Sequence, residues 1–220
     1  MLKAVIFDMD GVIIDSEPTH KKMENETYNK LGIEVTEDEH NTFVGSTSRY
    51  MWETLKNTYK INQTLEELIE YERNIYFKYL NSDECEIKLI DGVKELIEDL
   101  HENGVKLAIA SSSPLNVIEA IAKKFKIEEY FEVFVTGDYV KKSKPEPDIF
   151  LLASEKLGVG AEECAVIEDS NNGVRAAKKA GMKCVGFNSD VDGRQDISMA
   201  DLVINSFKEV NYIKLSSETD

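Results

Sequence analysis

From residue 87 onward, short apolar segments alternate with longer amphipathic ones, and this alternation limits the possible fold more than any other feature of the chain. The short segments are rich in β-branched residues and almost free of charge, which is typical of strands buried on both faces. We expect strands at residues 105–110, 133–136, 164–167, 184–187 and 202–204, and helices at 93–103, 114–125, 147–157 and 172–180. Strands that alternate with helices predict a doubly wound, Rossmann-like α/β fold with a parallel sheet.

The first apolar segment, residues 2–7, ends abruptly in Asp8-Met9-Asp10-Gly11. Side chains two positions apart in a strand point the same way, so Asp8 and Asp10 could reach one site if the chain stays extended. Asp and Gly also favour turns, and a strand that merely ends in a turn explains this motif equally well. Other residues must decide between the two interpretations.

Residues 16–86 have a different character, with amphipathic, charged segments and little that resembles a buried strand. Pro18 suits the first turn of a helix that Gly32 ends, and Thr36 with Glu39 has the spacing of a capping box. The expected helices span residues 17–31, 36–43, 49–59 and 64–80. The sequence therefore predicts an α/β core domain, residues 1–15 and 87–220, and an inserted helical cap domain, residues 16–86, placed to act as a lid. Residues 216–220 are expected to form a frayed polar tail.

Composition limits the partners and the compartment. The formal net charge of −16 argues against a nucleic-acid partner, because phosphate backbones bind clustered Lys and Arg. Cys85, Cys164 and Cys184 are too far apart in sequence to suggest a compact zinc site. Charge at Asp8 interrupts any signal-peptide core, and no segment reaches the length of a membrane span. We expect a reduced, cytoplasmic monomer that binds neither nucleic acid nor membrane.

Polar groups follow four of the expected strands, where ligands bind in an open parallel sheet. They are Asp8 with Asp10, the serines at 111–113, Lys144, and Glu168 with Asp169. Carboxylates at such an edge suit Mg²⁺, which would bring a phosphate group. A carboxylate can attack phosphorus to form an acyl phosphate, and a second one can transfer protons. The edge therefore predicts phosphate chemistry.

Each of these groups also has a plain structural explanation. Ser111 could cap the helix that follows it. Lys144 lies among other lysines and could belong to a solvated basic loop. Glu168 and Asp169 could be the acids that favour the start of a helix, although a buried strand aims them at the same edge.

Four segments, taken in order, resemble the motifs of the haloacid dehalogenase-like superfamily of phosphotransferases. They are Phe7-Asp8-Met9-Asp10-Gly11-Val12, Ala110-Ser111-Ser112-Ser113, Ser143-Lys144-Pro145 and Ile167-Glu168-Asp169-Ser170. The helical insertion resembles the C1-type cap of the subgroup that includes β-phosphoglucomutase and sugar-phosphate phosphatases. Each motif is weak alone, but four in order at predicted strand ends are specific.

This resemblance implies a role for each acid. Asp8 would be the nucleophile and a ligand of Mg²⁺, and Asp10 would be the general acid and base and give its main-chain carbonyl to the metal. Asp169 would bind the metal directly. Glu168 would be a neighbouring ligand or would act through water, and the resemblance does not decide between these two.

The resemblance also implies phosphate-binding and substrate-binding groups. Ser111, with the N–H of Ser112, would hold the phosphoryl oxygens, and Lys144 would neutralise their charge in the transition state. In the cap, His20 stands where β-phosphoglucomutase has a substrate-contacting histidine. Arg49 resembles that enzyme's phosphate-gripping arginine. Arg73 and Asn74 could line the opposite cap helix, although a solvated helix face explains them better.

The choice of reaction depends on the cap loop. β-Phosphoglucomutases have a Lys-Gly-x-Ser-Arg loop, whereas this chain has Val44-Gly45-Ser46-Thr47-Ser48-Arg49, without the lysine and with an extra residue. We therefore expect Mg²⁺-dependent hydrolysis of a small phosphorylated metabolite, a sugar phosphate, with mutase activity as the alternative. A receiver-like binding module, phosphorylated on aspartate, is a more distant alternative, because it would have no helical lid.

Overall fold

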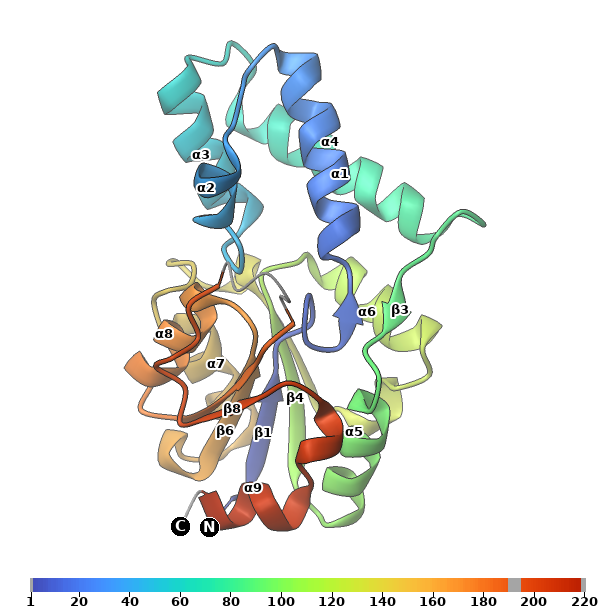
Figure 1. Ribbon diagram of the computed structural model, residues 1–220, viewed down its shortest axis with the longest axis vertical. Helices are drawn as coiled ribbons and strands as arrows, with labels where there is room; N and C mark the ends of the chain where they lie inside the picture. Colours follow the sequence, from blue (N-terminus) through green and yellow to red (C-terminus); the bar gives the residue numbers. More distant parts are fainter. Residues whose placement is uncertain (1, 190–194, 219–220) are drawn as a thin grey trace.

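A six-stranded parallel sheet forms the centre of the larger part of the protein (Figure 1). The computed structural model describes residues 2–189 and 195–218. In spatial order the strands are β5 (Val133–Thr136), β4 (Lys106–Ser111), β1 (Ala4–Phe7), β6 (Cys164–Glu168), β7 (Lys183–Phe187) and β8 (Leu202–Ile204). Every pairing is parallel. The chain moves outward from β1 to one edge and then to the other, which is the doubly wound order and confirms the predicted fold class.

Helices cover both faces of this sheet because the strand residues alternate between two apolar clusters. In β1, Val5 and Phe7 belong to one cluster, and Ala4 and Ile6 belong to the other. The first cluster includes side chains of α5 (Val93–Glu102), α6 (Leu115–Lys124) and α9 (Tyr212–Glu218), and the second includes those of α7 (Asp148–Leu157) and α8 (Asn171–Lys179). The strands are therefore apolar on both sides, as their sequence predicts.

The predicted strands and helices of this part agree with the observed ones to within one or two residues. Two features differ. A small antiparallel pair, β2 (Ile14–Asp15) and β3 (Lys88–Leu89), was not predicted, because strands of two residues have no detectable period. The predicted frayed tail was wrong for residues 216–218, which belong to α9, where Leu215 is buried in the first cluster. Residues 219–220 lie outside the described part of the chain.

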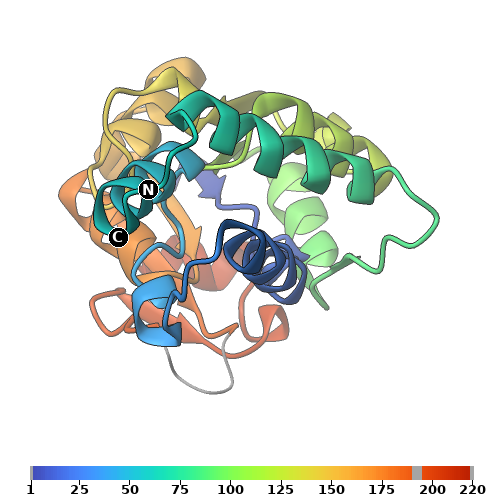
Figure 2. The ribbon, with the colours of Figure 1, turned by 90° about the horizontal axis from the view of Figure 1, so that it is seen from above.

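Four helices between β2 and β3 stand above the carboxyl end of the sheet, opposite α9 (Figure 1). They are α1 (Glu17–Leu31), α2 (Glu37–Asn41), α3 (Ser48–Tyr59) and α4 (Leu65–Leu80). Seen from above, α1 is nearly end-on while α4 runs along one side (Figure 2). These helices have an apolar cluster of their own around the fully buried Trp52. The exact domain boundaries stay a prediction.

Local signals explain where these helices begin and end. Gly32 ends α1 in the left-handed conformation, as expected. Thr36 accepts a hydrogen bond from the Glu39 main chain at the start of α2, and Thr64 with Glu67 forms a complete capping box before α4.

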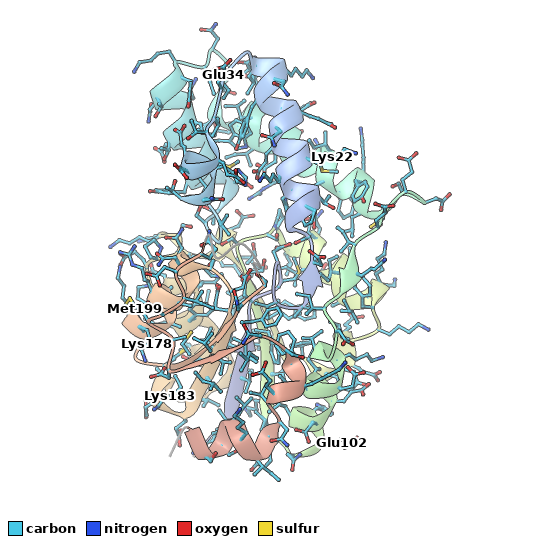
Figure 3. All side chains as sticks on the ribbon, viewed as in Figure 1. Lys22, Glu34, Glu102, Lys178, Lys183 and Met199 are labelled. Atoms are coloured by element: carbon cyan, nitrogen blue, oxygen red, sulfur yellow. The ribbon has the colours of Figure 1, made fainter. Side chains whose placement is uncertain are left out.

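Charged side chains such as Lys22, Glu34 and Glu102 point away from the ribbon (Figure 3). Among the described helices, none is long and apolar enough to cross a membrane.

Candidate active site

The two aspartates of the first motif lie where β1 ends. Gly11 adopts a positive φ of 79°, and a Cβ there would lie only 1.9 Å from an Asp169 carboxylate oxygen. Only glycine permits both this backbone conformation and this approach. The turn that follows β1 therefore faces the end of β6, and Asp8 and Asp169 belong to one site.

Lys144 links the ends of β1 and β6 through its contacts with Asp8 and Glu168. Its Nζ lies 2.6 Å from an oxygen of Asp8 and 2.6 Å from an oxygen of Glu168, and all three side chains are buried. Burial alone would lower the pKa of the lysine, but the two carboxylates outweigh this effect and raise it, so Lys144 is charged at neutral pH. It is thus a buried cation of the site and no part of a solvated loop.

The environment of Asp8 makes its carboxylate form costly. Burial raises the pKa of Asp8 to about 8; Lys144 opposes this effect, and the negative charges of Glu168 and Asp10 add to it. A bound divalent cation would lower this pKa and favour the ionised carboxylate. The electrostatics of the buried acids therefore suit a cation.

Three carboxylates are placed to hold such a cation. Oxygens of Asp8, Glu168 and Asp169 lie within 4.8 Å of one another. Oxygen ligands at this spacing fit Mg²⁺. Glu168 also accepts hydrogen bonds from the main-chain N–H groups of Asp169 and Ser170, at 2.9 and 3.0 Å, and from the Ser170 hydroxyl at 3.0 Å. Together with Lys144, these groups give Glu168 four hydrogen-bond donors.

Asp10 is surrounded by hydrogen-bond donors from both parts of the protein. Its oxygens lie 2.6 Å from the Ser16 hydroxyl, 3.3 Å from Nε2 of His20, 2.8 Å from the Ser113 hydroxyl and 3.4 Å from the Ser111 hydroxyl. Burial acts to raise the pKa of Asp10, but the hydrogen bonds and charge of its neighbours, His20 first, hold it below its ordinary value. In this arrangement Asp10 is an ionised, tightly oriented carboxylate.

The serines after β4 have separate contacts. Ser111 is buried and accepts a hydrogen bond from the main chain of Ser113 at 3.0 Å, whereas Pro114 occupies the cap position of α6. The Ser112 hydroxyl donates to the main-chain oxygen of Gly45 in the cap, at 2.8 Å. Ser111 therefore faces Asp10, and Ser112 links the core to the cap.

A pocket lies over Asp8, Asp10 and Asp169, between the sheet edge and the cap helices, and the cap contributes one of the two predicted substrate residues to it. His20 lines it and stacks on Tyr76 with the ring centroids 4.3 Å apart. Arg49 does not line it: the side chain is 56% exposed and lies 3.4 Å from Glu66. The reason is helical geometry, since Met51 and Trp52 of α3 turn toward the cap core and Arg49 toward solvent. The expected phosphate grip by Arg49 thus finds no support in the structure.

Sequence reasoning missed most of the cap side of the pocket. Glu24, His40, Glu72 and Tyr76 line it without having been singled out, and Arg73 lines it although a solvated helix face was the favoured interpretation. Burial raises the pKa of Glu72 to about 7, with the nearby Glu24 adding to the effect. The four-residue spacing of Glu72 and Tyr76 puts them on one helix face, but acids on helices are too common to mark a site.

Polar contacts join the cap helices to the α/β part beside this pocket. The Thr47 main chain donates to the Ser143 hydroxyl at 2.9 Å, next to Lys144. The Asn172 side chain donates to the main-chain oxygens of Thr42 and Val44, at 3.0 and 2.9 Å. The pocket is therefore lined by acids of the α/β part on one side and by residues of the cap helices on the other.

The fold and the site together define an α/β enzyme with acids and a lysine at the carboxyl edge of its sheet. The family model of the haloacid dehalogenase-like hydrolases matches residues 5–187. A relative from Thermotoga maritima, named phosphorylated carbohydrates phosphatase, is 36% identical over 185 residues, which is 83% of each chain. The chain therefore belongs to the haloacid dehalogenase-like hydrolase family.

Solved structures agree with this assignment. CbbY from Rhodobacter sphaeroides, solved in complex with phosphate, has a TM-score of 0.84 and 28% identity over 98% of this chain and 100% of that one. A β-phosphoglucomutase from Clostridium difficile has a TM-score of 0.86 over 100% of this chain and 97% of that one. At 23% identity the latter shows the shared fold alone. The predicted resemblance is confirmed, and the protein is an enzyme of the phosphatase type.

Proposed function

We propose that this protein hydrolyses a small phosphomonoester, a sugar phosphate, through an aspartyl-phosphate intermediate on Asp8 with the help of Mg²⁺. The observation that best supports the proposal is the position of Lys144, buried 2.6 Å from both Asp8 and Glu168. A buried lysine between two acids at a sheet edge offers a fixed positive charge to an incoming phosphate. The similarity to the Thermotoga maritima phosphatase of phosphorylated carbohydrates supports the substrate class.

In the first step, a carboxylate oxygen of Asp8 attacks phosphorus and the bond from phosphorus to the alcohol oxygen breaks. Asp10 gives a proton to the departing oxygen, so that the alcohol leaves neutral. The substrate's negative charge would raise the pKa of Asp10 and favour this protonated form. Ser111, with the N–H of Ser112, holds the phosphoryl oxygens, and Lys144 offsets their charge.

In the second step, water attacks the phosphorus of the aspartyl phosphate. Asp10, now a carboxylate, takes the proton from that water, the bond to Asp8 breaks, and inorganic phosphate leaves. The donors around Asp10, Ser16 and His20 among them, orient its carboxylate for both proton transfers.

Asp8, Asp169 and the main-chain carbonyl of Asp10 would hold Mg²⁺. Glu168 already accepts four hydrogen bonds from the protein, so we assign it to positioning Lys144 and to contact with the metal through water. Bound Mg²⁺ would supply positive charge that neutralises the phosphoryl oxygens and favours the ionised Asp8.

We also propose that residues 16–86 form the cap domain that closes this pocket against water. Closure would prevent water from competing with Asp8 in the first step and would strengthen the electrostatic interactions inside the pocket. The contacts of Thr47 and Asn172 with the core support this role.

The test is a panel of phosphorylated sugars with Mg²⁺, in which free phosphate and isomer products are measured together. We expect phosphate release that stops when a chelator removes the metal. Rapid conversion of β-glucose 1-phosphate to glucose 6-phosphate after priming with a bisphosphate would contradict hydrolysis and favour the mutase reaction.

A further inference from the structure

The cap side of the pocket presents two carboxyl groups from neighbouring helices. Glu24 of α1 lies 3.1 Å from Nδ1 of His40. Glu72 of α4 accepts hydrogen bonds from the indole N–H of Trp52 at 2.7 Å and from the Ser48 hydroxyl at 3.1 Å. Both acids line the pocket. These contacts hold two carboxyl groups in place on the cap side of the pocket. The opposite side, at Asp8 and Lys144, is called the phosphate end below.

Positive charge in this part of the pocket is limited. Among the described residues that line it, Arg73 is the one lysine or arginine, and its guanidinium lies 2.7 Å from Asp138 of the core. The two donors to Glu72 are neutral. Burial and the proximity of Glu24 raise the pKa of Glu72 to about 7, which shows how poorly its charge is compensated. His20 and His40 also line the pocket, and His40 pairs with Glu24. A second anionic group of a ligand would meet the poorly compensated acid of Glu72 here.

Two buried polar atoms in this region make no hydrogen bond within the described part of the chain. They are Nε of Arg73 and the hydroxyl oxygen of Tyr76, a residue that is only 5% exposed. A buried polar atom without a hydrogen bond is costly, so these atoms need a partner from a ligand. The arginine N–H requires an acceptor, and the tyrosine hydroxyl can donate or accept.

We propose that Glu24, Glu72 and Tyr76 form the leaving-group subsite and select phosphomonoesters of uncharged polyhydroxy alcohols. Alcohols with a second phosphate or a carboxylate group would be disfavoured. This inference rests on the proposed phosphatase function and adds the substrate class. A hydroxyl group both donates and accepts, so it satisfies the carboxylates and the arginine N–H together.

A matched pair of substrates tests the subsite. Sorbitol 6-phosphate and 6-phosphogluconate share a carbon chain and differ in a terminal hydroxymethyl or carboxylate group. We expect kcat/KM to be at least about tenfold higher for sorbitol 6-phosphate, the scale of one poorly matched polar contact.

Substitution of the acids links this preference to the subsite. Glu72→Gln keeps the shape and one acceptor oxygen but removes the charge, and we expect it to reduce the preference for sorbitol 6-phosphate over 6-phosphogluconate by about fivefold or more. Glu70→Gln makes the same charge change on the exposed side of α4 and should leave the preference unchanged. If Glu72→Gln does not fold, Glu24→Gln provides the same test.

The outcomes separate the inference from the function on which it rests. Phosphate release without preference within this pair would overturn the subsite and leave the phosphatase intact. A preference that Glu72→Gln and Glu24→Gln both leave unchanged would also overturn it. No phosphate release from any ester would overturn the phosphatase and the subsite together.

Discussion

The two ends of the pocket are built in different ways. At the phosphate end, Asp8, Lys144 and Glu168 are buried, and Lys144 lies 2.6 Å from each of the two acids, which stand at the ends of β1 and β6. At the cap end, Glu24 and Glu72 come from the sides of two helices, and their contacts are with other cap residues, His40 and Trp52 among them.

This difference separates the residues that take part in the reaction from the residues that select the substrate. A sheet edge brings strand ends to fixed positions, which suits groups that must meet phosphorus in one geometry. Helix sides tolerate exchange of single residues, which suits groups that recognise a variable alcohol. We therefore expect substitutions at the phosphate end to affect all substrates, and substitutions at the cap end to affect the choice among them.

The largest expected effect is at Asp8. Asp8→Asn removes the attacking carboxylate and should lower kcat on every sugar phosphate by at least about 10⁴-fold, the scale seen when a covalent nucleophile is removed. Phosphate release is the measurement, and circular dichroism controls for folding. Full activity in this variant would exclude the covalent mechanism.

Lys144 tests whether the buried charges of the phosphate end depend on one another. Lys144→Met leaves Asp8 and Glu168 close together without their cation, so the free energy of unfolding should fall by about 3 kcal/mol or more, as when one partner of a buried pair is removed. Urea denaturation measures the change.

The same denaturation experiment, repeated with Mg²⁺, tests whether a metal binds beside Asp8. A bound divalent cation offsets the two acids, so millimolar Mg²⁺ should stabilise Lys144→Met more than the parent protein. Lys142→Met, in the exposed part of the same loop, should leave stability unchanged. Equal stabilisation of the parent and Lys144→Met by Mg²⁺ would argue against a metal beside Asp8.

Asp10 tests proton transfer separately from attack. Asp10→Ala should lower turnover by about a hundredfold or more, the usual scale for general acid and base catalysis, while Mg²⁺ binding, measured by calorimetry, persists. Unchanged turnover would exclude the assigned role. The loss should be similar for all alcohols, in contrast to the selective effect expected at Glu72.

Most of the α/β part could be predicted from the sequence because its signals are local. Residues 133–136 and 202–204 are strands with the predicted bounds, since an uncharged β-branched run between helices has few alternatives. The short β2 and β3 could not be predicted, because their pairing depends on where the cap begins and ends rather than on any pattern within them.

The site divides in the same way. The sequence predicts that Asp8, Lys144 and Glu168 lie close together, because parallel strands end at one edge of a sheet. Arg49 and Glu72 could not be placed, because the direction of a helix side chain depends on how α3 and α4 pack. Arg49 had the residue type expected of a phosphate ligand and turned to solvent, whereas Glu72, one acid among many, lines the pocket.

The smallest expected effect concerns the charge of Glu72 at the cap end. Burial, with the neighbouring Glu24, raises its pKa from 4.5 to about 7, so the folded protein keeps a proton that the unfolded chain releases. Stability therefore falls as pH rises from about 4.5 through 7. Glu72→Gln has no such proton, and it should be more stable than the parent at pH 8, by roughly 1–2 kcal/mol, but not at pH 5.

Urea denaturation at the two pH values measures this difference, with Glu70→Gln as the matched control on the exposed side of α4. The control should differ from the parent equally at both pH values, because the side chain of Glu70 is exposed to solvent. A pH-independent difference for Glu72→Gln would mean that its carboxyl group is compensated in the folded protein. The cap end would then be neutral toward anionic alcohols, and the contrast between the two ends of the pocket would be one of position and not of charge.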